Sequence, residues 1–373
     1  MSETAVVSSE KLNGGLDGDE QWFGIDIGGT LTKGVYFESH CASDDHEQEA
    51  AIEQIRKFVK SSVKYGSTGM RDEHLEIKDQ TIGQRTGTLH FLKFSTSRMD
   101  GFLNIISDNR LHDCRNVVCA TGGGAVKFEQ KINEKLAIKV EKYDELHCLV
   151  SGLHYIHHQP GECFTWTNLQ PSGKGGDKEV VDFGASMYPY IIVNIGSGVS
   201  IMLVKSENEV QRIGGSSIGG GTFTGLCSLL TGCNSFAEAI ELAEQGDNTK
   251  VDKLVKDIYG GDYDKFGLTG DTVACSFGSM MDPEKRAQAT KADLAKAVLV
   301  TVTNNIGGIT KMLAYSFEVR KVVFSGNYLT NNNMSMQMLA YALQYWSHSA
   351  ILSIFLRHEG YCGALGALIK HCS

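Results

Sequence analysis

The stretch WFGIDIGGTLTKGVYFES (residues 22–39) decides how the fold is interpreted. Apolar residues lie on both sides of a turn with two consecutive glycines, which is typical of a β-hairpin rather than of a strand that leads into a helix. Glycine amides can approach phosphate oxygens, and an aspartate can hold Mg²⁺ directly or through water. The candidate ATP and phosphate ligands here are Asp26, Gly28, Gly29, Thr30 and Lys33. A plain hairpin turn with a solvated lysine is the alternative.

A second hairpin repeats this chemistry further along the chain. Residues 190–213 alternate apolar runs with the turns NIGSG (194–198) and ENE (207–209), which predicts a β-meander. Two phosphate-type turns in equivalent places are stronger evidence than either turn alone. Further candidate phosphate ligands are Gly196, Gly219, Gly220, Gly221 and Gly326. A flexible loop packed under a helix is the alternative for 214–223. Because no GxxxxGK[ST] motif occurs, ATP is expected between two lobes if it binds at all.

The layout of hairpin, strand and helices occurs twice. The strand 116–121 runs into glycines and then a helix, and amphipathic spacing predicts another helix over 51–63. Capping signatures at Ser235 and Thr290 predict helix starts, and Gly246 suits a helix end. We expect a disordered acidic tail at 1–20, an N-terminal lobe at 21–187 and a C-terminal lobe at 188–373. Residues 158–187 are expected to form a surface insertion near the boundary.

Composition narrows the class of protein. The 373 residues carry a net charge of −9, which argues against nucleic acid as a partner, and no long apolar run predicts a transmembrane segment. The ten cysteines form no CxxC pair and are expected to be buried free thiols in a reducing compartment. The N-terminal residues resemble neither a signal nor a transit peptide, so we expect a cytoplasmic protein.

Several blocks together resemble a known family. DIGGTLTK, NIGSGVS, GGGTF and VVFSGN resemble the actin/hexokinase/sugar-kinase ATPase superfamily. CATGGGAVKFE, GGGTFTGLCSLLTGC, DIYGGDYDKFGL and LAYALQYWS look like the eukaryotic-type (type II) pantothenate kinases. The resemblance runs from Trp22 to the C-terminus. It implies an α/β, two-lobed actin/hexokinase-like (ribonuclease H-like) fold with an ATP cleft between the lobes.

The resemblance also implies an activity and a set of site residues. The activity is transfer of the γ-phosphate of MgATP to pantothenate, which forms 4′-phosphopantothenate in the first step of coenzyme A synthesis. The family pattern makes Glu129 the catalytic base, and it implies a homodimer inhibited by acetyl-CoA or other acyl-CoA. It assigns pantothenate and acyl-CoA to Ser197, Ser200, Arg212, Ala274 and Trp346.

Two other functions stay open. One is a catalytically inactive relative that senses acyl-CoA or nucleotide, against which the presence of Asp26, Lys33, Glu129 and Arg212 argues. The other is a different small-molecule kinase of the same fold. The sequence departs from the superfamily at Asn194, where aspartate is frequent, so the metal is assigned to Asp26.

Overall fold

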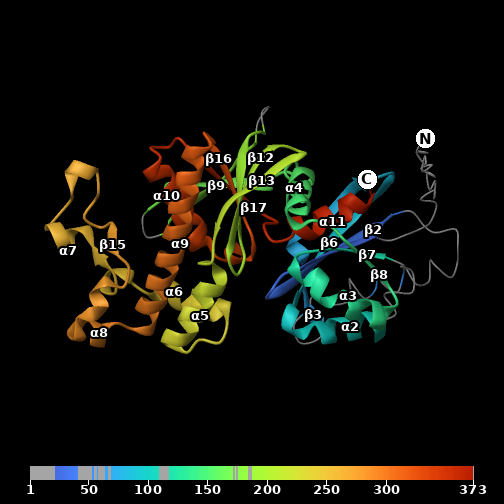
Figure 1. Cartoon of the computed structure of the whole chain (residues 1–373), viewed down its shortest axis with the longest axis horizontal. Coiled ribbons are helices and arrows are strands. Elements are labelled where there is room, and N and C mark those ends of the chain that lie inside the picture. The colour runs from blue at the N-terminus through green and yellow to red at the C-terminus, as the bar shows by residue number, and fades with distance from the viewer. Residues whose placement is uncertain are drawn as a thin grey trace, which may run out of the picture.

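The structure is a computed structural model. It describes residues 22–40, 53, 57, 64–65, 69–108, 117–170, 173, 175–183 and 187–372. Two mixed β-sheets alternate with three layers of helices (Figure 1). The first sheet has the order β3-β4-β6-β2-β1-β7-β8, with β5 on β6, and the second has the order β10-β9-β17-β16-β11-β12-β13. The protein therefore has two α/β lobes, as the sequence predicts.

The first lobe grows from the predicted hairpin, which is confirmed. β1 (Trp22–Ile27) pairs with β2 (Leu31–Ser39) in antiparallel register, and β7 (Val117–Thr121) runs parallel to β1. The other strands are β3 (Lys64–Tyr65), β4 (Gly69–Arg71), β5 (Ile77–Ile82), β6 (Arg85–Ser95) and β8 (Lys139–Lys142). Apolar residues of α2 (Met99–Asp108) and α3 (Gly123–Leu136) cover the outer face of this sheet.

The second lobe repeats the pattern. The predicted meander is confirmed as β11 (Tyr190–Ile195), β12 (Val199–Ser206) and β13 (Glu209–Ser216). The remaining strands are β9 (Cys163–Thr167), β10 (Asp177–Val180), β16 (Lys321–Ser325) and β17 (Leu352–Leu356). Its outer face is covered by α5 (Gly220–Thr231), α6 (Phe236–Gln245), α9 (Lys291–Ser316) and α10 (Asn333–Trp346).

A third layer of helices lies between the sheets. α4 (Glu145–Ile156) and α11 (Cys362–Cys372) pack against each other, and their apolar side chains share one core with residues of both sheets. The arm 248–289 projects from the far end of the second lobe (Figure 1). It holds β14 (Lys253–Leu254), α7 (Val255–Tyr259), β15 (Val273–Cys275) and α8 (Pro283–Gln288). The lobes are thus joined by a common apolar middle layer.

The same glycine junction occurs once in each lobe. Gly122 follows β7 with φ +83°, and Gly326 follows β16 with φ +105°. A Cβ on Gly122 would lie 2.6 Å from Asp26 Oδ1, and one on Gly326 would lie 2.7 Å from Asn194 Oδ1. Each lobe therefore packs a side-chain-free turn against the end of its own hairpin, which confirms the internal repeat.

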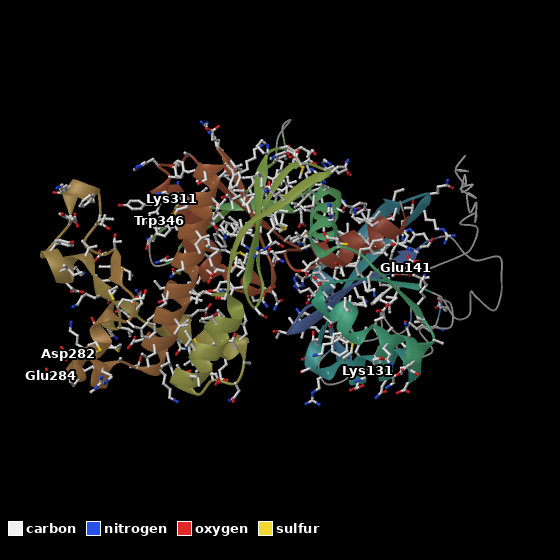
Figure 2. All side chains as sticks on the ribbon, viewed as in Figure 1. Lys131, Glu141, Asp282, Glu284, Lys311 and Trp346 are labelled. Carbon is white, nitrogen blue, oxygen red and sulfur yellow. The ribbon has the colours of Figure 1, made fainter. Side chains whose placement is uncertain are left out.

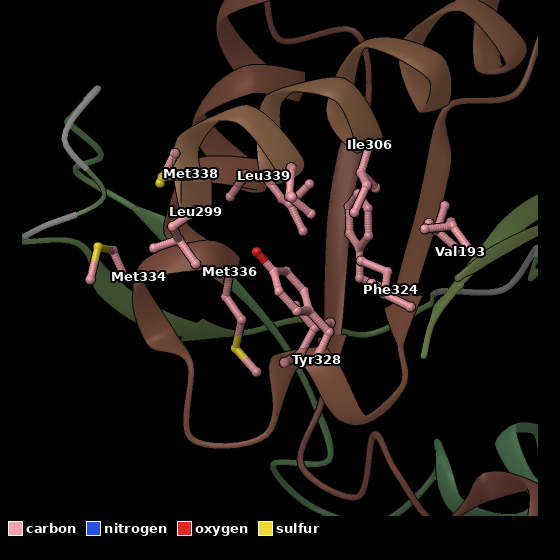
Figure 3. Close-up of a cluster of buried hydrophobic side chains, with 14 of the residues drawn as sticks. Val193, Leu299, Ile306, Phe324, Tyr328, Met334, Met336, Met338 and Leu339 are labelled. Atoms are coloured by element: carbon pink, nitrogen blue, oxygen red, sulfur yellow. The ribbon is translucent and has the colours of Figure 1, made fainter. Parts of the chain in front are cut away.

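The core of the second lobe anchors one of these junctions. Tyr328 follows Gly326 and points inward among apolar side chains, including Leu299 and Met336 (Figure 3). Its hydroxyl lies 2.9 Å from Thr303 Oγ1, so the buried oxygen has a hydrogen-bond partner.

The boundary between the lobes lies earlier in the chain than the predicted 187/188. The described residues of 158–187 include two strands of the second sheet, where a surface insertion was expected. β9 and β10 belong to the second sheet, where Phe164 and Trp166 are core residues. The chain crosses between Ile156 and Cys163, and α11 returns to pack on β1 of the first sheet. Strand partners that are distant in the sequence decide this boundary.

Other local predictions have mixed outcomes. The caps are confirmed, since the Ser235 hydroxyl accepts from the Glu238 amide at 3.2 Å and Thr290 and Asp293 form a capping box. Gly246 ends α6 with φ −89°, so it is needed for its close approach to the Ala292 carbonyl rather than for a left-handed turn. The eight described cysteines are free, but Cys275 is exposed, against expectation.

Some predictions fall on other parts of the chain. The tail 1–20 lies outside the described residues, as does the helix predicted over 51–63 apart from positions 53 and 57. Among the described residues, no helix is long and apolar enough to cross a membrane.

Candidate active site

The two hairpin turns meet across the lobes. Thr30 Oγ1 of the first turn lies 3.4 Å from Ser197 Oγ of the second. Thr96 braces the first turn, because its hydroxyl donates to the Gly28 carbonyl at 2.9 Å and its amide donates to the Thr30 carbonyl at 2.9 Å. A Cβ on Gly29 would lie 3.9 Å from Ser197 Oγ, which is an ordinary van der Waals contact between the two turns. The structure thus brings together candidates from both hairpins.

Asp26 lies at the end of β1, directly across from Lys33 on β2. Its carboxylate is enclosed by Gly122 and by Gly363 of α11, where a Cβ would lie 2.7 Å from Oδ2. Burial raises the pKa of Asp26, and the nearby charge of Lys33 lowers it in part. No described residue donates a hydrogen bond to this carboxylate. It is therefore available to a cation or a metal-bound water.

These residues fit a magnesium ion held mainly by substrate and water. No group of three or more candidate ligands is present among the described residues. Mg²⁺ commonly uses one or two carboxylates, several waters and substrate phosphates rather than an all-protein cage. Asp26 supplies such a carboxylate beside the turn.

Lys33 is 7% exposed and faces a cleft of about 510 Å³ between the lobes. Burial lowers the pKa of Lys33, whereas the charges of Asp26 and Glu359 raise it. Asn327 and Thr330, in the loop after Gly326, line the same cleft from the second lobe. The cleft is therefore lined by Lys33, a candidate phosphate ligand of the first lobe. It is also lined by the loop after Gly326, which is a candidate phosphate ligand of the second lobe.

The glycines at the start of α5 hold the second turn in place. The Gly220 amide donates to the Gly196 carbonyl at 2.9 Å, and the Gly221 amide donates to the Ser197 carbonyl at 3.0 Å. Gly219 donates to Thr222 Oγ1 at 3.3 Å. These amides are already bonded, which favours a packing role over the expected anion seat at this helix N-terminus.

Ser200 and Arg212 lie side by side on the meander. Arg212 Nε donates to Ser200 Oγ at 3.3 Å, and the guanidinium of Arg212 is exposed. Ser200 follows the turn that carries Ser197. Three of the predicted pantothenate ligands, Ser197, Ser200 and Arg212, therefore lie on the meander, and the planar cation of Arg212 stands next to the Ser200 hydroxyl.

Glu129 lies on α3, the helix that starts after Gly122. Its side chain is 33% exposed, and its Oε2 accepts a hydrogen bond from Lys142 Nζ at 2.6 Å. No sequence pattern points to Lys142, which ends the short strand β8. If Glu129 accepts a proton, it does so through Oε1, or through Oε2 after the hydrogen bond from Lys142 breaks.

Ala274 and Trp346 lie away from the hairpin turns of the same chain. Ala274 is in β15 of the arm, and Trp346 ends α10 beside Gly307 of α9 (Figure 2). The Tyr345 hydroxyl donates to the Gly267 carbonyl at 3.2 Å, which ties the arm to this end of α10. Within one chain, these two candidates form a separate region.

Sequence reasoning missed a polar cluster beside Lys33. Tyr361 Oη donates to Asp72 Oδ2 at 2.5 Å, and Lys93 Nζ donates to both oxygens of Asp72 at 2.8 and 2.9 Å. Glu359 and Tyr361 come from the segment FLRHEGYCGALGALIK (355–370) near the end of the chain. Its charged residues among apolar neighbours were the available signal.

Two α/β lobes of the same layout, with glycine hairpin turns that meet, define a protein of the actin/hexokinase-like fold class. Comparison with known families then identifies the particular group. The chain belongs to the Fumble family, whose model matches residues 22–370. This confirms the resemblance to type II pantothenate kinases.

Individual relatives match over almost the whole chain. A pantothenate kinase of Schizosaccharomyces pombe is 36% identical over 94% of this chain and 81% of its own length. Pantothenate kinase 2 of Arabidopsis thaliana is 35% identical over 93% of this chain, and a mouse 4′-phosphopantetheine phosphatase is 36% identical over 93% of it. The matches span 38% of the plant protein and 40% of the mouse protein.

Proposed function

We propose that this protein is a pantothenate kinase, which uses MgATP to convert pantothenate to 4′-phosphopantothenate at the start of coenzyme A synthesis. The observation that carries the proposal is the contact between Thr30 and Ser197, which places the phosphate-type turns of both lobes at one point. Relatives named pantothenate kinase, matched over 93–94% of this chain, support the choice of substrate.

The side chains divide the chemistry as follows. Phosphoryl transfer depends mainly on positioning and on neutralising charge. Lys33 and the hairpin turns hold the phosphates, and Asp26 holds the magnesium ion that shields their charge. The pantothenate hydroxyl attacks the γ-phosphorus, the bond to the bridging oxygen of ADP breaks, and the hydroxyl proton passes to the Glu129 carboxylate.

The substitution Glu129→Gln tests this role. It keeps the size of the side chain but removes the proton acceptor, so turnover should fall by roughly 10²- to 10⁴-fold while ATP and pantothenate still bind. Glu134→Gln, on an exposed position of the same helix, is the matched control and should leave turnover unchanged.

The assay is ATP consumption with and without pantothenate, with substrate binding followed by calorimetry. Wild-type protein that consumes no ATP when pantothenate is added would refute the proposed function. Intact binding with normal turnover in the Glu129→Gln protein would remove Glu129 from the role of base.

Feedback inhibition is part of the same proposal. Acetyl-CoA contains pantothenate already joined to phosphates, so it can occupy the hairpin site of Ser197, Ser200 and Arg212 and extend toward the phosphate turns. Such a ligand excludes ATP. The apparent inhibition constant of acetyl-CoA should therefore rise with ATP concentration, and an apparent constant independent of ATP would place the inhibitor elsewhere.

We also propose that the protein is a homodimer in the cytoplasm. Large apolar side chains are exposed on the arm and on α5, with Met281 86% and Leu229 84% accessible, and a second protomer would cover such side chains. Ala274 and Trp346 would then contribute to an acyl pocket between protomers. Sedimentation velocity tests the dimer. The free cysteines support the cytoplasmic location, because thiols stay reduced in that compartment, and cell fractionation tests it.

A further inference from the structure

The segment 357–361 connects β17 of the second lobe to α11, which packs on the first lobe. His358 is 2% exposed, and its Nδ1 lies 2.6 Å from Glu162 Oε2, in the turn before β9. Its Nε2 lies 2.7 Å from the Leu75 carbonyl of the first lobe. This return segment is therefore bonded to both lobes where the chain crosses between them.

Glu359 is the residue of this segment that contacts the second-lobe loop. Its carbonyl accepts from the Gly326 amide at 3.0 Å and from Ser325 Oγ at 2.5 Å. The Thr330 hydroxyl donates to Asn327 Oδ1 at 3.5 Å and lies near the Glu359 carboxylate. The loop after β16 is thus held at its start by the backbone of Glu359, and its later residue Thr330 lies near the side chain of Glu359.

The same residue acts on Lys33 of the first lobe. The Lys33 ammonium lies against Gly360, where any Cβ would collide with Nζ, and 6.0 Å from the centre of the Tyr361 ring. The charged and titratable groups that act on Lys33 are Asp26 of β1, Lys93 of β6, Glu359 and the Cys362 thiol. Glu359 supplies the negative charge on the side of the return segment.

We propose that Glu359 is a positioning residue for the phosphoryl-transfer site, whose backbone carbonyl holds the Gly326 loop and whose carboxylate places a negative charge in the cleft that Lys33 faces. Glu359 thereby fixes the distance between Lys33 of the first lobe and the Gly326 loop of the second lobe. The inference rests on the proposed function to the extent that Lys33 binds the phosphates of ATP.

The substitution Glu359→Gln tests the charge. Glutamine keeps the volume of the side chain and leaves the backbone bonds to the Gly326 loop in place, but it removes the negative charge near Lys33. We expect the KM for MgATP and the Kd of a non-hydrolysable MgATP analogue to rise roughly tenfold, as for the loss of one charged interaction. kcat and the KM for pantothenate should change less than about threefold, because the groups at Glu129 and Arg212 are untouched.

Three further variants complete the experiment. Glu179→Gln, an exposed position of β10, is the matched control for charge removal and should leave all constants unchanged. Glu359→Asp restores the charge and should recover part of the nucleotide affinity. Thr330→Val removes only the hydroxyl and should weaken MgATP in the same direction by a smaller factor, which tests the proposal even if the Glu359→Gln protein does not fold.

The outcomes separate this inference from the proposed function. If the wild-type protein binds the analogue and Glu359→Gln binds it equally well, the positioning role is wrong and the proposed function stands. Equal losses in kcat, in both KM values and in the melting temperature would show a merely structural role and also overturn it. If the wild-type protein binds no MgATP analogue, the proposed function fails and the inference fails with it.

Discussion

Replacing Gly122 with alanine should destabilise the first lobe and disturb Asp26. Gly122 precedes α3 with φ +83° and ψ 160°, a backbone conformation that is essentially restricted to glycine. A Cβ at this position would lie 2.6 Å from Asp26 Oδ1 and 2.8 Å from the Ile27 carbonyl. Both contacts are shorter than van der Waals separation, so the turn or β1 has to move.

The size of the effect combines two costs. Forcing a non-glycine residue into this region costs about 1–3 kcal/mol. The displaced backbone adds a packing cost of about 1 kcal/mol or more, which brings the loss to roughly 2–4 kcal/mol. This is a large part of a typical unfolding free energy of about 5–15 kcal/mol.

Urea denaturation of Gly122→Ala and Gly123→Ala proteins measures the effect. Gly123 is the next residue, and a Cβ there meets nothing within 4 Å. Alanine favours a helix by up to about 1 kcal/mol over glycine, so the control should be unchanged or slightly more stable. If the Gly122→Ala protein unfolds at the same urea concentration as the control, the conformational argument is refuted.

Gly326→Ala should lower stability by a similar 2–4 kcal/mol in urea denaturation, because φ is +105° and the Cβ would lie 2.5 Å from the Ile195 carbonyl; wild-type stability would contradict this. Burial lowers the pKa of His154 to about 4, so the folded protein resists its protonation and stability should fall as pH decreases from about 6.5 toward 4. His154→Gln should reduce this slope in pH-dependent unfolding, and an unchanged slope would place its origin elsewhere. Arg212→Ala should weaken both pantothenate use and thioester inhibition, on the order of 2 kcal/mol, and inhibition equal to wild type would exclude Arg212 from that site.

Local features of the fold follow from the sequence. The hairpin at 22–39, the meander from Tyr190 and the capped helices depend on turn glycines, alternation and caps, which act between residues close in the chain. The candidates Asp26 and Lys33 also belong to one hairpin, so their cross-strand pairing follows from its register.

The arrangement of the site depends on contacts between distant parts of the chain. Thr30 and Ser197 are 167 residues apart, and their contact requires both sheets and the helices between them. The same holds for Lys142 beside Glu129, for β9 in the second sheet and for Glu359 beside Lys33.

The sequence by itself therefore determined the hairpins, the glycine junctions and the chemical groups available for phosphate and metal. Only the tertiary structure decided which groups meet and which amides, such as those of Gly220 and Gly221, are already bonded. The physical reason is that propensities and turn geometry act over a few residues, whereas sheet order and burial depend on the packing of the whole chain.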